Sequence, residues 1–155
     1  MPNEATAYHE AGHAVVAFHL GKCIRRVTIV GGDDAAGMCY HYRSKIRHDT
    51  DNSTRARLDA EKRAMINMAG ILTQHTFSPT SVRSHHGSWD FKNAIAIMSH
   101  HAGDDSLEVY LRLLEIWTRN IITTRWPQIE AVANELLKWS TLTGKEAWAI
   151  YHNQL

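Results

Sequence analysis

Two histidines lie four residues apart near the start of the chain, and a glutamate directly follows the first of them. These are His9, Glu10 and His13, within the segment 7–17. Residues four apart share one face of an α-helix, so both imidazoles can reach one metal ion from the same side. Glu10 is the next residue after His9 on the helix, and its carboxylate can reach a water molecule bound to that ion. His-Glu-x-x-His on a helix is typical of zinc-dependent hydrolases.

The residues around this motif favour a metal centre over a solvated polar face. Its neighbours are small or apolar, namely Ala5, Ala7, Ala11, Ala14, Val15, Ala17 and Phe18. Imidazole and carboxylate groups inside an apolar helix cost free energy unless they have partners. A catalytic zinc satisfies such groups and keeps one coordination position open for a water molecule, whose pKa it lowers to about 7.

Length and composition are those of one globular domain. The chain has 155 residues, of which 44% are hydrophobic and 21% charged, so residues 1–155 are expected to form a single domain with a core of its own. The net charge of +1 gives no electrostatic argument for binding nucleic acid or an anionic membrane. Cys23 and Cys39 are too few for a disulfide framework, and no apolar run is long enough to span a membrane. A cytoplasmic location is therefore expected.

The first third of the chain predicts one helix and two strands. The helix is expected over about 3–20, with Asn3 as N-cap and Gly21 as its stop. The β-branched segment 24–30 and the segment 37–42 read as strands that form a hairpin. The predicted fold is mainly α, with a small β element of two or three short strands beside the helix that carries His9.

The rest of the chain predicts helices. They are expected over 53–77, from Ser88, from Asp104 or Ser106, and over 126–139, and a Thr143–Glu146 capping box opens a short last one. Trp117, Trp126, Trp139 and Trp148 are expected to pack between helices. The other positions expected in the core are Leu58, Met65, Met68, Ala69, Leu72, Phe91, Ala94, Ile95, Met98, Leu107, Tyr110, Leu111, Leu114 and Ile121.

A catalytic zinc usually takes three protein ligands, so one more has to be found. His19 has the spacing of His-Glu-x-x-His-x-x-Gly-x-x-His, a pattern in which the glycine ends the helix. Val16 stands in place of that glycine, so the helix is expected to continue and to turn His19 about 240° away from His13. We therefore exclude His19. The residues themselves leave the choice open among Asp90, His85, His86 and Glu61.

Four segments follow one another in an order that resembles a known family. They are 7–17, Ala-Tyr-His-Glu-Ala-Gly-His-Ala-Val-Val-Ala; 26–30 with 36–38; 87–94; and 142–146, Leu-Thr-Gly-Lys-Glu. The first resembles the zinc helix of the FtsH-type metallopeptidase family, and the second resembles the strand pair that follows it. The third resembles the segment that holds the third zinc ligand, and the fourth resembles the closing Leu-x-Gly-x-Glu signature. The resemblance spans nearly the whole chain.

This resemblance implies a largely helical zinc metalloendopeptidase domain. One Zn²⁺ would be held by His9, His13 and Asp90, and Glu10 would act as general base towards the attacking water. The substrate would be an unfolded polypeptide or a peptide. It would lie as an added strand along the exposed strand within 37–42. Such binding uses hydrogen bonds to the substrate main chain and therefore tolerates many side-chain sequences.

The chain also departs from this family. We find no ATPase motif and no membrane anchor in it, and 69–75 stands in place of the family's Gly-Arg-Ala-Ala-Glu-Glu stretch. A separate ATPase or self-association is therefore an open expectation, as is a fragment of a longer ATP-dependent protease. The alternative function is a catalytically silent, zinc-stabilised binding or regulatory module. Glu10 argues against that alternative, because a structural zinc site needs no general base.

Overall fold

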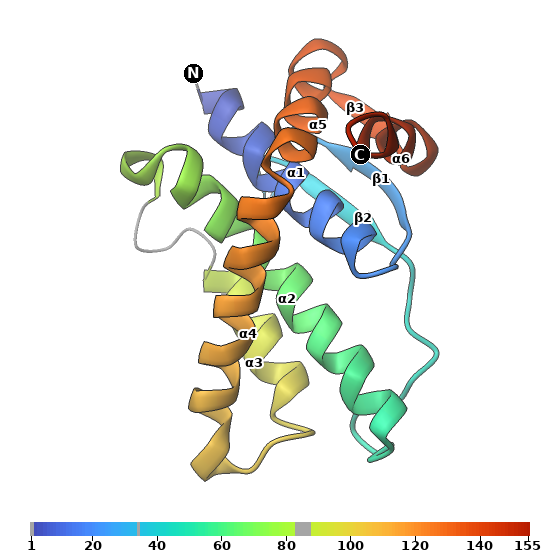
Figure 1. Ribbon diagram of the computed structural model, residues 1–155, viewed down its shortest axis with the longest axis vertical. Helices are drawn as coiled ribbons and strands as arrows, with labels where there is room; N and C mark the ends of the chain where they lie inside the picture. The colour runs from blue at the N-terminus through green and yellow to red at the C-terminus, as the bar shows by residue number, and fades with distance from the viewer. Residues whose placement is uncertain (1, 34, 83–87) are drawn as a thin grey trace.

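The computed structural model describes residues 2–33, 35–82 and 88–155, which contain six α-helices and three strands (Figure 1). The expected mainly helical fold with a small β element is confirmed. No helix in these ranges is both long enough and apolar enough to cross a membrane. In chain order the elements are α1 Pro2–His19, β1 Ile24–Thr28, β2 Met38–His41, α2 Thr54–Phe77, the 3₁₀ turn η1 Pro79–Ser81, α3 Ser88–Met98, α4 Asp104–Thr124, α5 Trp126–Trp139, β3 Thr141–Thr143 and α6 Gly144–Asn153.

The helix α1 lies at the centre of the molecule, between the sheet and α2 (Figure 1). It ends where expected, because Gly21 takes a positive φ of 76° that side chains disfavour. The crossing of α1 and α2 is close. A Cβ atom on Gly12 would lie only 2.3 Å from Thr73 Oγ1 and 2.9 Å from the Ala69 carbonyl oxygen. Gly12 therefore sets how near the two helices can approach.

Helix boundaries follow the local signals in the sequence. The Ser53 side chain caps α2 by accepting a hydrogen bond from the Ala56 amide, as predicted. The capping box of α6 is also present. Thr143 Oγ1 accepts from the Glu146 amide at 3.2 Å, and Glu146 Oε2 accepts from the Thr143 amide at 2.8 Å. Such caps satisfy amides that have no partner inside the helix, so they fix where each helix begins.

Several apolar positions face solvent where the core was predicted. Leu58, Ile95 and Trp117 are exposed, and so are Trp139 and Trp148. In α4 the buried row is Leu114, Thr118 and Ile122, which turns Trp117 outward. Thr118 can enter the core because its hydroxyl donates to the Leu114 carbonyl at 2.7 Å. Helical spacing fixes which residues share a face, but neighbouring elements decide which face is buried.

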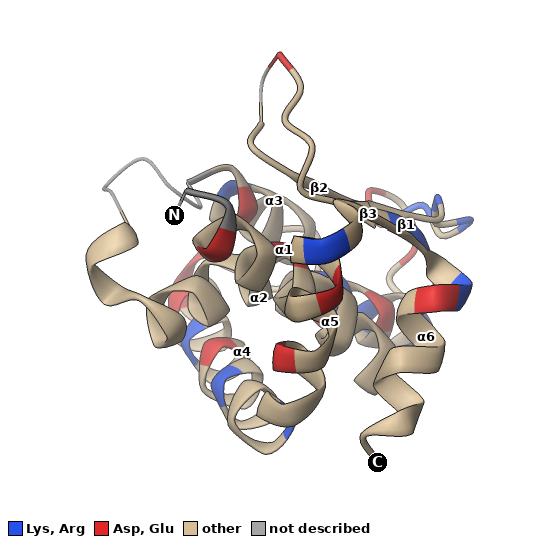
Figure 2. Cartoon of the chain, turned by 90° about the horizontal axis from the view of Figure 1, so that it is seen from above, with Lys and Arg blue, Asp and Glu red and all other residues tan. Residues whose placement is uncertain are grey.

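The sheet is antiparallel, with strand order β2-β1-β3. The predicted hairpin of the first two strands is confirmed, although the first strand ends at Thr28. The third strand lies outside the predicted elements, and Leu142 is its buried residue. Helices cover one face of the sheet, and the β1–β2 connection rises on the other side (Figure 2). The strand β2 is thus an edge of the sheet, beside α1.

Candidate metal centre

The structure brings His9 and His13 of α1 together with Asp90 in the first turn of α3. His9 Nε2 lies 3.2 Å from Asp90 Oδ2, His13 Nε2 lies 3.5 Å from the same oxygen, and the two Nε2 atoms are 3.1 Å apart. Among the described residues this is the cluster of His, Cys, Asp or Glu side chains whose ligand atoms converge as a metal ion requires. The three residues expected to bind zinc therefore meet at one point.

The spacing of these three atoms fits a tetrahedral ion. Ligands about 2.0–2.1 Å from one zinc ion, at tetrahedral angles, lie roughly 3.3 Å from one another. Gly70 of α2 faces the same point, because a Cβ atom there would lie 2.3 Å from His13 Nε2 and 2.5 Å from His9 Nε2. The missing side chain leaves space where the three donors meet. Donor type, donor spacing and this space all suit Zn²⁺.

A hydrogen-bond chain fixes the orientation of the His9 ring. Gln74 Nε2 donates to the Ser81 carbonyl oxygen at 3.3 Å and to Ser81 Oγ at 3.2 Å. A carbonyl oxygen can only accept, so the Gln74 amide must point its Oε1 atom towards His9 Nδ1, 3.0 Å away. His9 Nδ1 is then the donor. Its Nε2 lone pair consequently points towards Asp90.

The His13 ring is fixed in the same way by the backbone of α2. His13 Nδ1 lies 2.7 Å from the carbonyl oxygen of Ile66, which can only accept. His13 therefore also carries its proton on Nδ1 and turns Nε2 towards Asp90. Two imidazoles with outer N–H groups held by neutral acceptors are the usual arrangement of metal-binding histidines.

Without a metal ion the cluster binds a proton. Burial by itself lowers the pKa of His13, but the hydrogen bond and charge of Asp90, together with the charge of Glu10, raise it to about 9. Burial acts to raise the pKa of Asp90, and the hydrogen bonds from His13 and His9 hold it well below its usual range. The carboxylate therefore stays ionised and attracts a cation to the two nitrogen atoms.

Glu10 lies beside this cluster and is 5% exposed. Burial is the main cause that raises the pKa of its carboxyl, while the nearby His13 and His9 act in the opposite direction. Glu10 also borders the start of β2, because a Cβ atom on Gly37 would lie 2.9 Å from Glu10 Cγ. The site therefore lies next to the edge strand of the sheet. A carboxylate whose pKa is raised towards neutrality is suited to moving a proton.

The other sequence candidates for a third ligand have different positions. His19 lies at the end of α1, outside the cluster, where Arg125 Nε donates to its Nδ1 atom at 3.1 Å. Glu61 accepts hydrogen bonds from Arg57 and Tyr110. His85 and His86 lie outside the described residues. Both Cys23 and Cys39 are free, as expected.

Sequence reasoning missed the contribution of α2 to the site. Ile66, Gly70 and Gln74 follow one another at intervals of four, so they form one stripe along that helix. The stripe supplies an acceptor for each histidine and the space between them. The signal in the sequence was a glycine in the middle of a helix with a polar residue one turn later.

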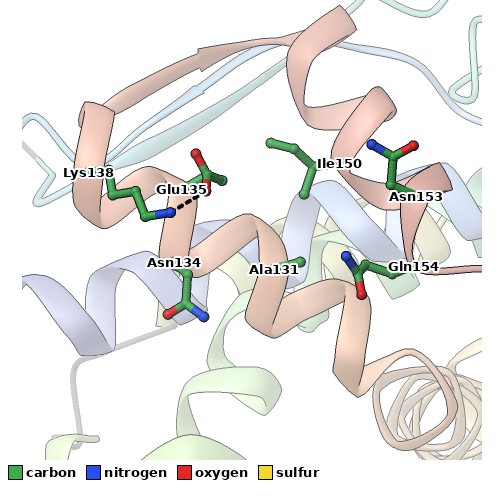
Figure 3. A pocket seen from close by; sticks show the side chains of 7 residues that line it. All are labelled: Ala131, Asn134, Glu135, Lys138, Ile150, Asn153 and Gln154. Atoms are coloured by element: carbon green, nitrogen blue, oxygen red, sulfur yellow. Dashed lines mark hydrogen bonds and ion pairs between the residues drawn. The ribbon is translucent and has the colours of Figure 1, made fainter.

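Two hollows lie apart from the cluster. One, of about 320 Å³, lies between α5 and α6, and Figure 3 shows the Glu135–Lys138 ion pair on one of its walls. The other, of about 560 Å³, lies on the sheet face that the helices leave open. Its lining includes Arg26, Met38 and Tyr40, next to the edge strand.

A scan against known protein families finds no match to this chain, and a search of curated proteins finds none either.

Proposed function

We propose that this protein is a zinc-dependent peptidase in which His9, His13 and Asp90 hold one Zn²⁺ ion. The observation that carries this proposal is the convergence of the two Nε2 atoms and Asp90 Oδ2, between 3.1 and 3.5 Å from one another, around the space that Gly70 leaves. The resemblance to the FtsH-type family supports the same ligands. It also supports an endopeptidase that acts on unfolded polypeptides.

Glu10 is the proposed general base. A bound zinc ion supplies a Lewis acid that acidifies a water molecule and polarises a carbonyl group. The Glu10 carboxylate accepts a proton from the attacking water and then donates it to the nitrogen atom of the departing amine. Its low exposure keeps bulk water from this exchange, and its raised pKa brings the carboxyl nearer to the working pH.

The edge strand supports a polypeptide as substrate. An edge strand carries unpaired backbone N–H and C=O groups that can bind another strand. The strand β2 is such an edge, and Gly37, directly before it, lies against Glu10. A polypeptide added to β2 would pass its own backbone beside the proposed base. Because only an extended chain can bind in this way, folded substrates would need a separate unfolding ATPase.

Hydrolysis of casein, an unstructured protein, by the zinc-loaded protein tests this function. Replacement Glu10→Gln keeps the shape of the side chain but removes the base, so turnover should fall by about 10²–10⁴-fold while one zinc ion per chain remains bound. Glu4→Gln, an exposed change on the same helix, is the matched control and should leave turnover unchanged.

Two results would count against the proposal. Unchanged turnover in a folded Glu10→Gln protein would exclude the proposed mechanism. One tightly bound zinc ion without turnover on any unfolded substrate would instead identify the silent, zinc-stabilised module.

A further inference from the structure

The open face of the sheet carries two pairs of arginine and tyrosine. Arg26 Cζ lies 4.3 Å from the centre of the Tyr40 ring, and Arg25 Cζ lies 5.9 Å from the centre of the Tyr42 ring. Both tyrosines are exposed. Each guanidinium group therefore extends from the central strand β1 towards the edge strand β2. Cations that lie over aromatic rings within about 6 Å are held there by the ring quadrupole.

A β-bulge explains how two consecutive residues face the same side. Ile24 pairs with His41 and Arg26 pairs with Tyr40, so Arg25 is an extra residue on β1. A bulge of this kind turns two successive side chains to one face of the sheet. The burial of β1 agrees, because Arg25 and Arg26 are both exposed between buried Ile24 and Val27. The backbone thus places both guanidinium groups on the open face.

Further positive charge follows at the same end of the sheet. Arg43 and Lys45 come directly after β2 and are exposed. No ion pair joins Arg25, Arg26, Arg43 or Lys45 to a carboxylate within the ranges 2–33, 35–82 and 88–155. Figure 2 shows Lys and Arg near the label β1, with some Asp and Glu beside them. Asp33 lines the open-face hollow from the β1–β2 connection, at the opposite end of the strands.

We infer that β2 and these four cations bind acidic polypeptide segments, an inference that rests on the proposed peptidase function. A strand added to β2 would place alternate side chains on the open face, beside Met38, Tyr40 and Tyr42. Asp or Glu residues next to Tyr40 and Tyr42 would meet the arginine charges that lie over those rings. The substrate class is therefore an unfolded, acidic polypeptide.

The edge of β2 favours a polypeptide over a nucleic acid. Main-chain groups of an edge strand pair with another main chain, which a nucleic acid does not provide. The same strand also leads directly to Glu10 through Gly37. The whole chain carries a net charge of only +1, so the positive charge at this end of the sheet is balanced by acidic residues elsewhere in the chain.

Binding to the Glu10→Gln protein, measured by fluorescence anisotropy, tests the inference without cleavage. Two labelled, unstructured peptides are compared that differ only in having Glu or Lys at alternate positions. The Glu peptide should bind at least about tenfold more tightly at low salt, and the difference should shrink as salt is raised. Arg25→Gln combined with Arg26→Gln should lower affinity for the Glu peptide by about tenfold.

The control is Arg112→Gln combined with Arg119→Gln, which removes the same charge from exposed positions on α4 and should leave binding unchanged. Equal affinity for both peptides, or an unchanged affinity after the Arg25 and Arg26 replacements, would overturn the inference. Tighter binding of a labelled single-stranded oligonucleotide than of the Glu peptide would also overturn it. Anisotropy measures binding and needs no turnover. Loss of acidic-peptide binding is therefore distinguished from absence of zinc-dependent hydrolysis.

Discussion

Two regions of the molecule join histidines to an aspartate, and only one of them is suited to a metal ion. In the proposed zinc site, Asp90 lies near Nε2 atoms of His9 and His13. In the second region, which we call the Asp59 network, Asp59 accepts from Lys22 and from Arg63 Nε, the latter at 2.8 Å. His48 Nε2 completes that network at 3.1 Å from Asp59 Oδ2.

The two regions differ in how the charge of the aspartate is neutralised. Burial acts to raise the pKa of Asp59, but hydrogen bonds and charges from Lys22 and Arg63 lower it to about 2. Its charge is therefore neutralised by side chains of the protein. Asp90 has no Lys or Arg partner within the described part of the chain, and only histidines hold its pKa down. An additional cation is favoured at Asp90 and disfavoured at Asp59.

The direction of the lone pairs also differs. His48 uses both ring nitrogens, one towards Asp59 and the other towards His101 Nε2 at 2.9 Å, so its two contacts point in opposite directions. His9 and His13 instead turn the same kind of nitrogen to one point. A metal site thus needs convergent lone pairs and a carboxylate that no Lys or Arg neutralises, and residue types alone do not provide them.

The largest effect is expected for Gly70→Ala, which fills only the proposed zinc site. The new methyl group would lie within 2.5 Å of both Nε2 atoms, so zinc binding and hydrolysis should be lost. Zinc content after dialysis and casein turnover measure this loss. Gly103→Ala, where a Cβ atom meets nothing closer than 4.0 Å, should retain both properties. A Gly70→Ala protein that binds zinc as tightly as the unchanged protein would place the metal elsewhere.

Replacing each aspartate by asparagine should separate the two regions. Asp90→Asn removes a proposed zinc ligand. Loss of a residue that only hydrogen-bonds to a ligand lowers metal affinity by about 10–100-fold, so loss of the ligand itself should weaken zinc binding by more than about 100-fold. Asp59→Asn should leave zinc affinity nearly unchanged. It should instead lower the free energy of unfolding by about 3 kcal/mol, because Lys22 and Arg63 lose a buried partner. Zinc titration and urea unfolding of both variants measure the contrast, and equal zinc affinities would contradict it.

A smaller effect is expected for Gln74→Leu. The leucine keeps the volume but cannot accept the His9 Nδ1 proton, so the ring loses its fixed orientation. Zinc affinity should fall by about 10–100-fold. Gln128→Leu, a buried glutamine whose amide donates to the Gln154 carbonyl oxygen, is the matched control and should leave zinc affinity unchanged. If both variants bind zinc equally well, the role assigned to Gln74 is wrong.

The smallest effect is expected for a change of one pH unit. The pKa of His13 is raised from 6.5 to about 9, so its interaction with Asp90 stabilises the metal-free protein fully below pH 6.5. That stabilisation is lost as pH rises through 9. Zinc displaces the same proton, so its affinity should instead rise by about tenfold for each pH unit up to 9. Urea unfolding between pH 6.5 and 9 should therefore show a stability that falls with pH without zinc and stays level when zinc is saturating. The same fall in both cases would contradict the assignment of His13.

Local signals in the sequence predicted most of the elements and their ends. Gly21, Ser53 and the Thr143–Glu146 box act within a few residues of their own positions, so their effect can be read without the fold. The position of the short third strand β3 was not predicted, because three residues that pair with β1 carry no periodicity of their own. Leu58 and Trp117 show the same limit for burial, which depends on the elements packed around each helix.

The sequence by itself determined that His9, Glu10 and His13 share one region of a helix, because a spacing of four residues is a local property. It left the third partner open among four residues until a family resemblance favoured Asp90. Only the tertiary structure placed Asp90 beside the histidines, with Gly70 and Gln74 of α2 behind them. The physical reason is that convergence of side chains from three helices depends on how closely those helices cross, which no single segment encodes.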